Sequence, residues 1–197
     1  TPAQFISAIA PSAGATCRAS ASSVSSSARF RSFACRERNA RFPSTDIAPG
    51  QTLAPAQVFQ GFGCTGGNLS PQLSWHGAPA GTKSYAITVY DPDAPTGSGW
   101  WHWSVFNIPT STTSLAAGTT TSTLPTGAVQ GRNDYGDSAY GGACPPPGDK
   151  AHRYQFTVWA LKTEKLPLDQ QTSGAMLGYM LNANALGKAQ LTGLYGR

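Results

Sequence analysis

Two carboxylates, two histidines and a tyrosine stand out among the residues of this chain that could do chemistry. Asp91 and Asp93 belong to the segment DPDAP, whose two prolines prevent the preceding apolar strand from continuing. His102 lies in a later aromatic segment, and His152 and Tyr154 open a third one. Carboxylate, imidazole and phenol groups in one cavity can bind an oxyanion through charge-assisted hydrogen bonds, or can transfer protons as general acids and bases.

The elements that position these side chains are expected to be β-strands. Ser84–Asp91 alternates, while Trp100–Ile108 and His152–Lys162 are rich in the aromatic and β-branched residues that suit strands. Leu73–Trp75 and Ala189–Tyr195 are weaker strand candidates. Because these short apolar runs are separated by Gly, Pro, Asn and Ser, they predict an antiparallel β domain.

The two-residue period of a strand predicts which side chains share a face. In the segment 100–108, one face is expected to carry Trp100, His102, Ser104 and Phe106. The opposite face is expected to carry Trp101, Trp103 and Val105. In the segment that begins at position 152, one face is expected to carry His152, Tyr154, Phe156 and Val158. Each strand thus offers a histidine near its start, which suits a pocket at the end of a sheet.

The loop YGGACPPPG at positions 140–148 combines small and rigid residues. Its glycines allow the backbone to approach a ligand closely, and its prolines hold that backbone in place. We expect its N–H groups to face an anion. The alternative is an ordinary stiff surface loop.

One helix is expected near the end of the chain. Ser173 can cap its first turn, and Gly187 can end it. An apolar stripe at helical spacing indicates core packing and no chemistry, and it comprises Met176, Leu177, Met180, Leu181 and Ala185.

The formal net charge of +5 is concentrated near the N-terminus. Six arginines and one glutamate lie within residues 1–45, so the remainder carries eight basic and eight acidic residues. A neutral body offers no basic surface to a phosphate backbone, and nucleic-acid binding is therefore not expected. The sequence contains no run of eighteen or more apolar residues, so a transmembrane segment is not expected either.

The chain is expected to divide near residue 40. Residues 1–40 are rich in Ser, Ala and Arg, poor in acids, and lack hydrophobic periodicity. This composition fits a transit peptide, the remnant of an export segment or a flexible tail, and we expect it to contribute little to the fold. Residues 41–197 are long enough to form one domain with its own core.

Several segments together resemble the phosphatidylethanolamine-binding protein family. Five motifs occur in the order and approximate spacing of that family: GGNLSPQLSW at 66–75, the DPDAP turn, GSGWWHWSVFNIP at 97–109, GGACPPPGD at 141–149 and the HRY triplet. The chain is most similar to the bacterial Raf-kinase-inhibitor-like branch, often called the YbhB/YbcL type. The resemblance runs from about Phe42 to the C-terminus and is not expected to include residues 1–40.

The resemblance implies a mainly β fold, an antiparallel β-sandwich of a large and a smaller sheet with Greek-key connections and short helices near the C-terminus. It also implies a pocket at the rim for phosphate, a phospho-headgroup or another small anion. By motif position, Asp91 supplies the carboxylate of this pocket, Asp93 supports its turn, and the loop prolines form its lip. The full set of implied ligand-binding residues is Asp91, Asp93, Trp100, His102, Gly142, Ala143, Cys144, Pro145, Pro146, His152 and Tyr154.

Two of the four cysteines are expected to form a disulfide. Cys17, Cys35, Cys64 and Cys144 show no CxxC spacing, so neither a zinc site nor a thioredoxin-like motif is supported. The family fold implies that the loops beside Cys64 and Cys144 meet at one rim, and a bridge there suits a periplasmic or secreted protein. The alternatives are a pocket-lining thiol at Cys144, where many relatives have glycine, and a cytoplasmic protein. Pairing of Cys17 with Cys35 stays open.

Three classes of function fit these residues. The expected one is a binding protein without catalytic residues, metal or cofactor, which holds a small anion and modulates a protein target such as a kinase or a protease, as similar proteins do. The second is a phosphoester hydrolase that uses the Asp, His and Tyr side chains as acids and bases, although the chain has neither a GxSxG nor an HExxH motif. The third is a protein-interaction module whose pocket is vestigial.

Overall fold

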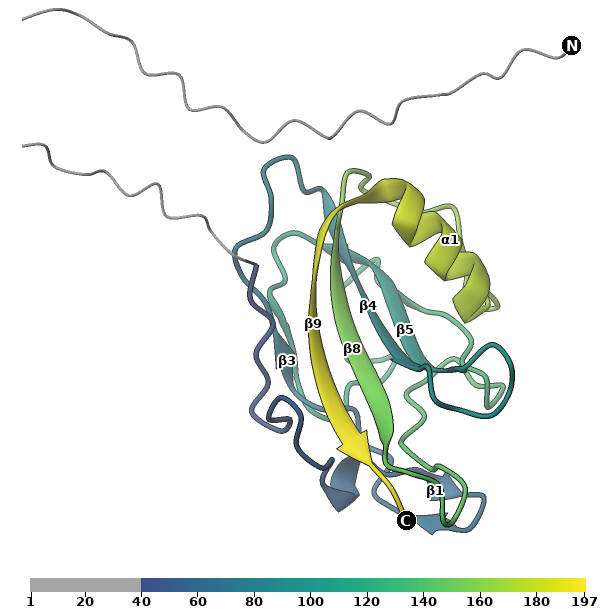
Figure 1. The fold of residues 1–197 in the computed structure, drawn as a ribbon. Helices are drawn as coiled ribbons and strands as arrows, with labels where there is room; N and C mark the ends of the chain where they lie inside the picture. The colour runs from purple at the N-terminus through teal and green to yellow at the C-terminus, as the bar shows by residue number, and fades with distance from the viewer. Residues whose placement is uncertain (1–39) are drawn as a thin grey trace, which may run out of the picture. The chain divides into compact units, whose positions relative to one another are not determined.

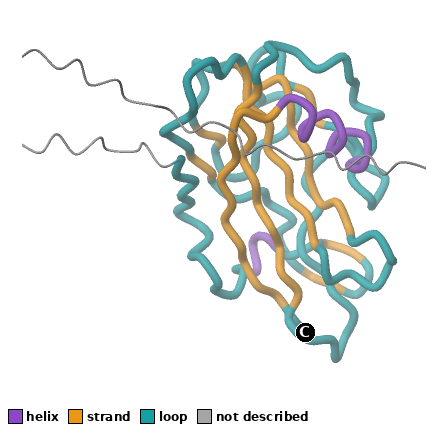
Figure 2. The backbone as a smooth tube through the Cα atoms, turned by 45° about the horizontal axis from the view of Figure 1, so that its top comes forward, coloured by secondary structure: helices purple, strands orange, loops and turns teal. Residues whose placement is uncertain are grey.

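A computed structural model describes residues 40–197, and its main element is a five-stranded antiparallel sheet (Figure 1). The strands follow the order β7-β5-β4-β8-β9, and the long ones lie side by side (Figure 2). The sheet is formed by β4 (Ser84–Asp91), β5 (Trp100–Pro109), β7 (Val129–Gln130), β8 (His152–Leu161) and β9 (Ala185–Tyr195).

The remaining strands are short. They form two antiparallel pairs, β1 (Gln60–Gly61) with β2 (Cys64–Thr65), and β3 (Leu73–Ser74) with β6 (Ser114–Leu115). A 3₁₀ turn covers Pro55–Gln57. The predicted mainly β fold is therefore confirmed, with one α-helix near the C-terminus where short helices were expected.

Both faces of the large sheet are buried, which explains why β4 is buried along almost its whole length. One face contributes side chains to a large hydrophobic cluster that includes Ile87, Val89, Trp103, Val105, Tyr154 and Phe156. The other face packs against the helix through a smaller cluster that includes Ala86, Phe106, Trp159, Leu161, Leu177 and Leu181. The sheet is thus a rigid support for the loops at its ends.

The helix α1 (Gly174–Asn184) covers one face of the sheet (Figure 1). Its N-cap is Ser173, as predicted, because the Ser173 hydroxyl accepts a hydrogen bond from the Met176 N–H. The leucines of the predicted stripe are buried, but the Met176 side chain is half exposed. The predicted end at Gly187 is wrong, because the backbone becomes extended at Ala185 and continues directly into β9.

A β-bulge in β5 changes which side chains reach the end of the sheet. Pairing with β4 shifts register between Trp101 and Trp103, so His102 is the extra residue. Trp103 consequently lies in the same cluster as Tyr154, whose ring also contacts His102, whereas Phe106 lies in the cluster beneath the helix. The predicted grouping of His102 with Phe106, and of Trp101 with Trp103, is wrong because an inserted residue breaks the two-residue alternation.

The N-terminal segment 1–39 lies outside the described residues. The predictions about its contribution to the fold, and about pairing of Cys17 with Cys35, therefore stay predictions. Between residues 40 and 197, no helix is long and apolar enough to cross a membrane.

Candidate functional site

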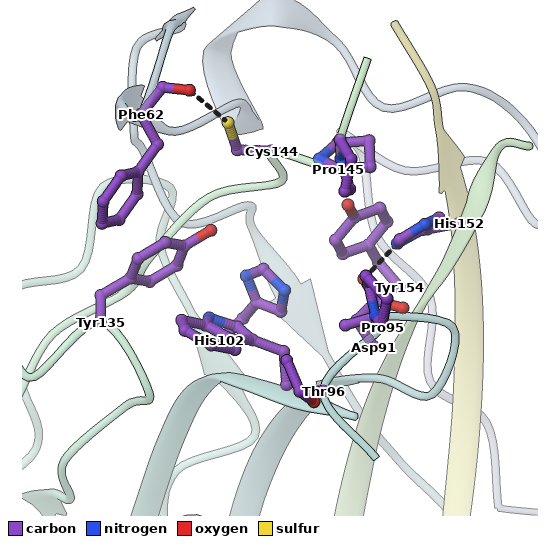
Figure 3. A pocket seen from close by; sticks show the side chains of 13 residues that line it. Phe62, Asp91, Pro95, Thr96, His102, Tyr135, Cys144, Pro145, His152 and Tyr154 are labelled. Carbon is purple, nitrogen blue, oxygen red and sulfur yellow. Dashed lines mark hydrogen bonds and ion pairs between the residues drawn. The ribbon is translucent and has the colours of Figure 1, made fainter. Parts of the chain in front are cut away.

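A cavity of about 290 Å³ opens where the end of β4 meets the starts of β5 and β8 (Figure 3). These ends coincide because β4 runs antiparallel to both neighbours. Eight of the predicted site residues line it: Asp91, Trp100, His102, Cys144, Pro145, Pro146, His152 and Tyr154. Five residues that the sequence analysis missed also line it: Phe62, Ala94, Pro95, Thr96 and Tyr135.

The last residue of β4, Asp91, forms a buried pair with His152. The carboxylate accepts hydrogen bonds from His152 Nδ1 at 2.7 Å and from the Asp93 N–H at 2.8 Å, so His152 Nδ1 carries a proton. The other nitrogen, His152 Nε2, lies 3.4 Å from Asp149 Oδ2. His152 is therefore held between two carboxylates.

Asp93 lies outside the cavity and ties the DPDAP turn to β8. Its carboxylate accepts hydrogen bonds from the backbone N–H, Nε and Nη2 of Arg153, at 2.9, 2.9 and 2.6 Å. These bonds lower the pKa of Asp93 from its ordinary value of 3.8 to about 2. Asp93 thus supports the turn, as the resemblance implies, without contacting the space for a ligand.

Replacing Asp93 by Asn is expected to lower the free energy of unfolding at pH 7 by about 0.5–1 kcal/mol, because the pair is partly exposed. The folded-state pKa lies below its ordinary value, so this contribution is present above pH 4 and is lost as the pH falls from about 4 to 2. Urea denaturation at pH 7 and pH 2.5 checks this. The control is Asp137→Asn, at an exposed carboxylate with no hydrogen bond among residues 40–197. A difference between wild type and Asp93→Asn that is as large at pH 2.5 as at pH 7 contradicts the prediction.

His102 is fixed by the loop that follows β7. Its Nδ1 lies 2.8 Å from the carbonyl oxygen of Gly141 and 3.1 Å from that of Gly142. Carbonyl oxygens only accept hydrogen bonds, so Nδ1 carries the proton. Burial lowers the pKa of His102, and the carbonyls and Asp91 only partly oppose this shift. In its neutral form the ring leaves Nε2 as an acceptor toward the cavity.

The backbone N–H groups of the glycine loop are used within the protein. Gly142 N donates to Asn68 Oδ1 at 2.8 Å, and Ala143 N donates to the carbonyl oxygen of Gln57 at 3.1 Å. Neither Gly142 nor Ala143 lines the cavity. The Gly142 and Ala143 amides therefore do not face an anion, and this part of the loop instead forms the support behind His102. For the N–H of Cys144, which lines the cavity, contact with an anion stays a prediction.

The most central residue that the sequence analysis missed is Tyr135. Its ring stacks on Phe59, with 4.0 Å between ring centroids, and makes edge contacts with Trp100 and His102. Its hydroxyl donates to the carbonyl oxygen of Gly142 at 3.1 Å. The only sequence signal is a pair of tyrosines in the loop NDYGDSAYGG, which has no strand or helix period.

Two polar groups of the pocket residues find no hydrogen-bond acceptor within residues 40–197, although the backbone N–H of Cys144 interacts with the Tyr154 oxygen. They are the indole Nε1–H of Trp100 and the hydroxyl of Tyr154, both hidden from solvent. Burial, reinforced by the negative charge of Asp91, raises the pKa of Tyr154, so its hydroxyl keeps its proton. Buried donors without partners are rare in native proteins, and neither atom is exposed to solvent in the cavity.

The pocket carries little charge. None of the described residues that line it is lysine or arginine, and its carboxylate, Asp91, has both oxygens engaged. Within residues 40–197, no cluster of three or more His, Cys, Asp or Glu side chains is arranged to hold a metal ion.

The lip of the pocket is cross-linked. Cys64 and Cys144 form the predicted disulfide, with 6.0 Å between their Cα atoms, so Cys144 does not present a free thiol. Its sulfur lies 3.7 Å from the Phe62 carbonyl oxygen (Figure 3), a contact without a hydrogen bond because a bridged sulfur has no proton. Arg197 joins the same two loops, since its Nε donates to the Pro145 carbonyl oxygen at 2.6 Å and its Nη1 to that of Gly63 at 2.9 Å.

The chain belongs to the phosphatidylethanolamine-binding protein family, whose model matches residues 43–196. It is similar to protein YbcL of Escherichia coli K12, with 58% identity over 175 residues, covering 87% of this chain and 96% of YbcL. Protein YbhB of the same organism is 46% identical over 154 residues, covering 77% and 97%. The crystal structure of E. coli YbcL superposes with a TM-score of 0.79, covering 80% and 98%.

The alignment with YbcL is longer than the segment 41–197. The sequence similarity therefore extends into the N-terminal segment, which we expected it to exclude.

Proposed function

We propose that this chain is a non-catalytic binding protein whose rim pocket holds a small anionic ligand, phosphate or a phospho-headgroup. The observation that supports this most strongly is the cavity itself, because two of its lining residues, Trp100 and Tyr154, each have a buried donor without an acceptor that a small side-chain rotation would turn toward a ligand. Oxygens of a phosphate group would supply the acceptors that both donors lack. Since no cation lines the cavity, recognition depends on neutral donors, and the ligand carries a low charge.

Removing either donor is expected to weaken anion binding. Calorimetric titration of phenyl phosphate into wild type, Trp100→Phe and Tyr154→Phe should show about tenfold lower affinity in each variant, because one hydrogen bond to an anion is lost. Tyr179→Phe is the matched control, since Tyr179 is exposed on α1 and does not line the cavity. Equal affinity in all four proteins would remove the support for this site.

The hydrolase alternative is less well supported by the geometry. The Asp91–His152 pair could orient a base, but His152 Nε2 faces Asp149 and reaches no nucleophile. Of the other candidates at the cavity, the Thr96 hydroxyl donates to the Gly99 carbonyl oxygen, and Cys144 is bridged. We expect no turnover of p-nitrophenyl phosphate. Turnover that disappears in His152→Ala would establish the hydrolase instead.

We further propose that the protein acts in the periplasm or outside the cell, and that ligand binding modulates a protein partner such as a kinase or a protease. The disulfide supports the compartment, because such bridges persist under oxidising conditions. Phe62 supports the partner, because 74% of its surface is exposed beside the pocket mouth. Non-reduced peptide mapping of the native protein tests the compartment. If variants of the pocket leave inhibition of a target intact, the pocket is vestigial.

A further inference from the structure

We propose that the pocket selects a phosphate monoester carrying one acidic proton over a phosphate diester of equal charge, because His102 presents a hydrogen-bond acceptor to the ligand. This inference rests on the proposed function, since it requires an anionic ligand in this cavity.

The acceptor is fixed by the backbone. His102 Nδ1 is directed at the carbonyl oxygens of Gly141 and Gly142, so the proton of the ring stays on that nitrogen. The ring is wedged edge-on between Tyr135 and Tyr154, with 5.6 and 5.1 Å between centroids (Figure 3). Among residues 40–197, nothing donates a hydrogen bond to Nε2. A ligand in the cavity therefore meets a lone pair at His102.

The other unpartnered groups of the pocket residues are donors, which a small side-chain rotation would turn toward a ligand. Trp100 Nε1–H and the Tyr154 hydroxyl need acceptors, whereas the oxygens of Asp91 are already bonded to His152 and to a backbone N–H. The complementary ligand thus has two acceptor oxygens and one O–H. A singly protonated phosphate monoester has this pattern. A diester lacks the O–H, and the dianion of the monoester both lacks it and meets the charge of Asp91.

The cavity also has room for the organic part of an ester. Its volume of about 290 Å³ is larger than a phosphate group needs, and an aromatic wall leads from it to the surface. This wall is formed by Tyr135 and Phe62, with 5.8 Å between their ring centroids, and the Phe59 ring stacks on Tyr135 at 4.0 Å and supports it. Phenyl phosphate is therefore a suitable probe, and methyl phenyl phosphate is its matched diester.

The comparison separates titration of the ligand from titration of the protein. The charged and titratable groups around His102 are Asp91 on β4, His152 and Tyr154 on β8, and Asp134 and Tyr135 in the loop before the glycines. The second pKa of a phosphate monoester is about 6, whereas a diester does not titrate between pH 5 and 7.5. Any change in the affinity for the diester between pH 5 and 7.5 therefore reflects titration of groups on the protein.

The experiment is calorimetric titration of both esters into the full chain at pH 5.0 and pH 7.5. At pH 5.0 both probes carry about one negative charge, and we expect the monoester to bind about tenfold more tightly. The ratio of affinities should fall toward one at pH 7.5, where most of the monoester has lost its second proton.

Two variants identify the residue responsible. His102→Phe keeps the ring and removes the acceptor, so it should reduce the affinity ratio at pH 5.0 to about one by weakening the monoester alone. Trp100→Phe removes a donor that serves both probes, so it should weaken both alike and keep the ratio. If His102→Phe does not fold, the wild-type ratio still decides.

The outcomes separate this inference from the proposed function. Equal affinity of the two esters for wild type at pH 5.0 overturns the selection of a proton donor and leaves anion binding standing. Failure of both esters to bind overturns the proposed function as well.

Discussion

Replacing both Cys64 and Cys144 by alanine is expected to lower the free energy of unfolding by about 4 kcal/mol. The bridge spans 80 positions of sequence, and closing a loop of that length lowers the conformational entropy of the unfolded chain. Urea denaturation of wild type and the double variant under non-reducing conditions measures the difference. The pocket should also lose affinity for phenyl phosphate, because the bridge holds its lip.

Reduction provides the control for this prediction. Wild type that is unfolded, reduced with dithiothreitol and refolded in its presence should have the same denaturation midpoint as the double variant. Dithiothreitol should not change the midpoint of the double variant itself. The Arg197 side chain, which joins the loops of Gly63 and Pro145, should hold the lip only in part once the bridge is gone. The prediction fails if wild type keeps the same midpoint with and without the reductant.

The strands that carry the site could be predicted from the sequence because their patterns are local. Ser84–Asp91 is the observed β4, and the strand expected from His152 ends one residue earlier than expected, at Leu161. In β8, the pairing with β4 shows no register shift from Gln155 to Leu161. Tyr154 and Phe156, which were predicted to share a face of this strand, therefore lie in the same hydrophobic cluster. Side-chain alternation and turn-forming prolines determine these features without distant contacts.

The remainder of the site depends on contacts between distant segments. The bulge at His102 arises where β5 pairs with β4, and no single-strand pattern marks it. The acceptor role of His102 follows from the Gly141 carbonyl oxygen, 39 positions away in the chain. Tyr135 and Asp149 reach the site from irregular loops, where sequence periodicity says nothing about direction.

Gly142 shows how closely the loop behind His102 is packed. A Cβ atom added there would lie 2.5 Å from three backbone atoms, Gln57 O, Val58 C and Phe59 N. Backbone atoms of a paired segment cannot move aside cheaply, in contrast to the end of a flexible side chain. Its carbonyl oxygen also accepts hydrogen bonds from His102 and Tyr135.

Gly142→Ala is therefore expected to destabilise the fold by about 3 kcal/mol and to abolish measurable binding of phenyl phosphate, because it displaces the loop that orients His102 and Tyr135. The matched control is Gly178→Ala on α1, where an added Cβ would lie 3.5 Å from Trp101 in ordinary contact. This control should raise stability by about 0.5–1 kcal/mol through helix propensity and leave binding unchanged. Thermal denaturation and calorimetry measure both effects. A Gly142→Ala protein as stable as wild type would show that the loop can move away from the 57–59 segment without cost.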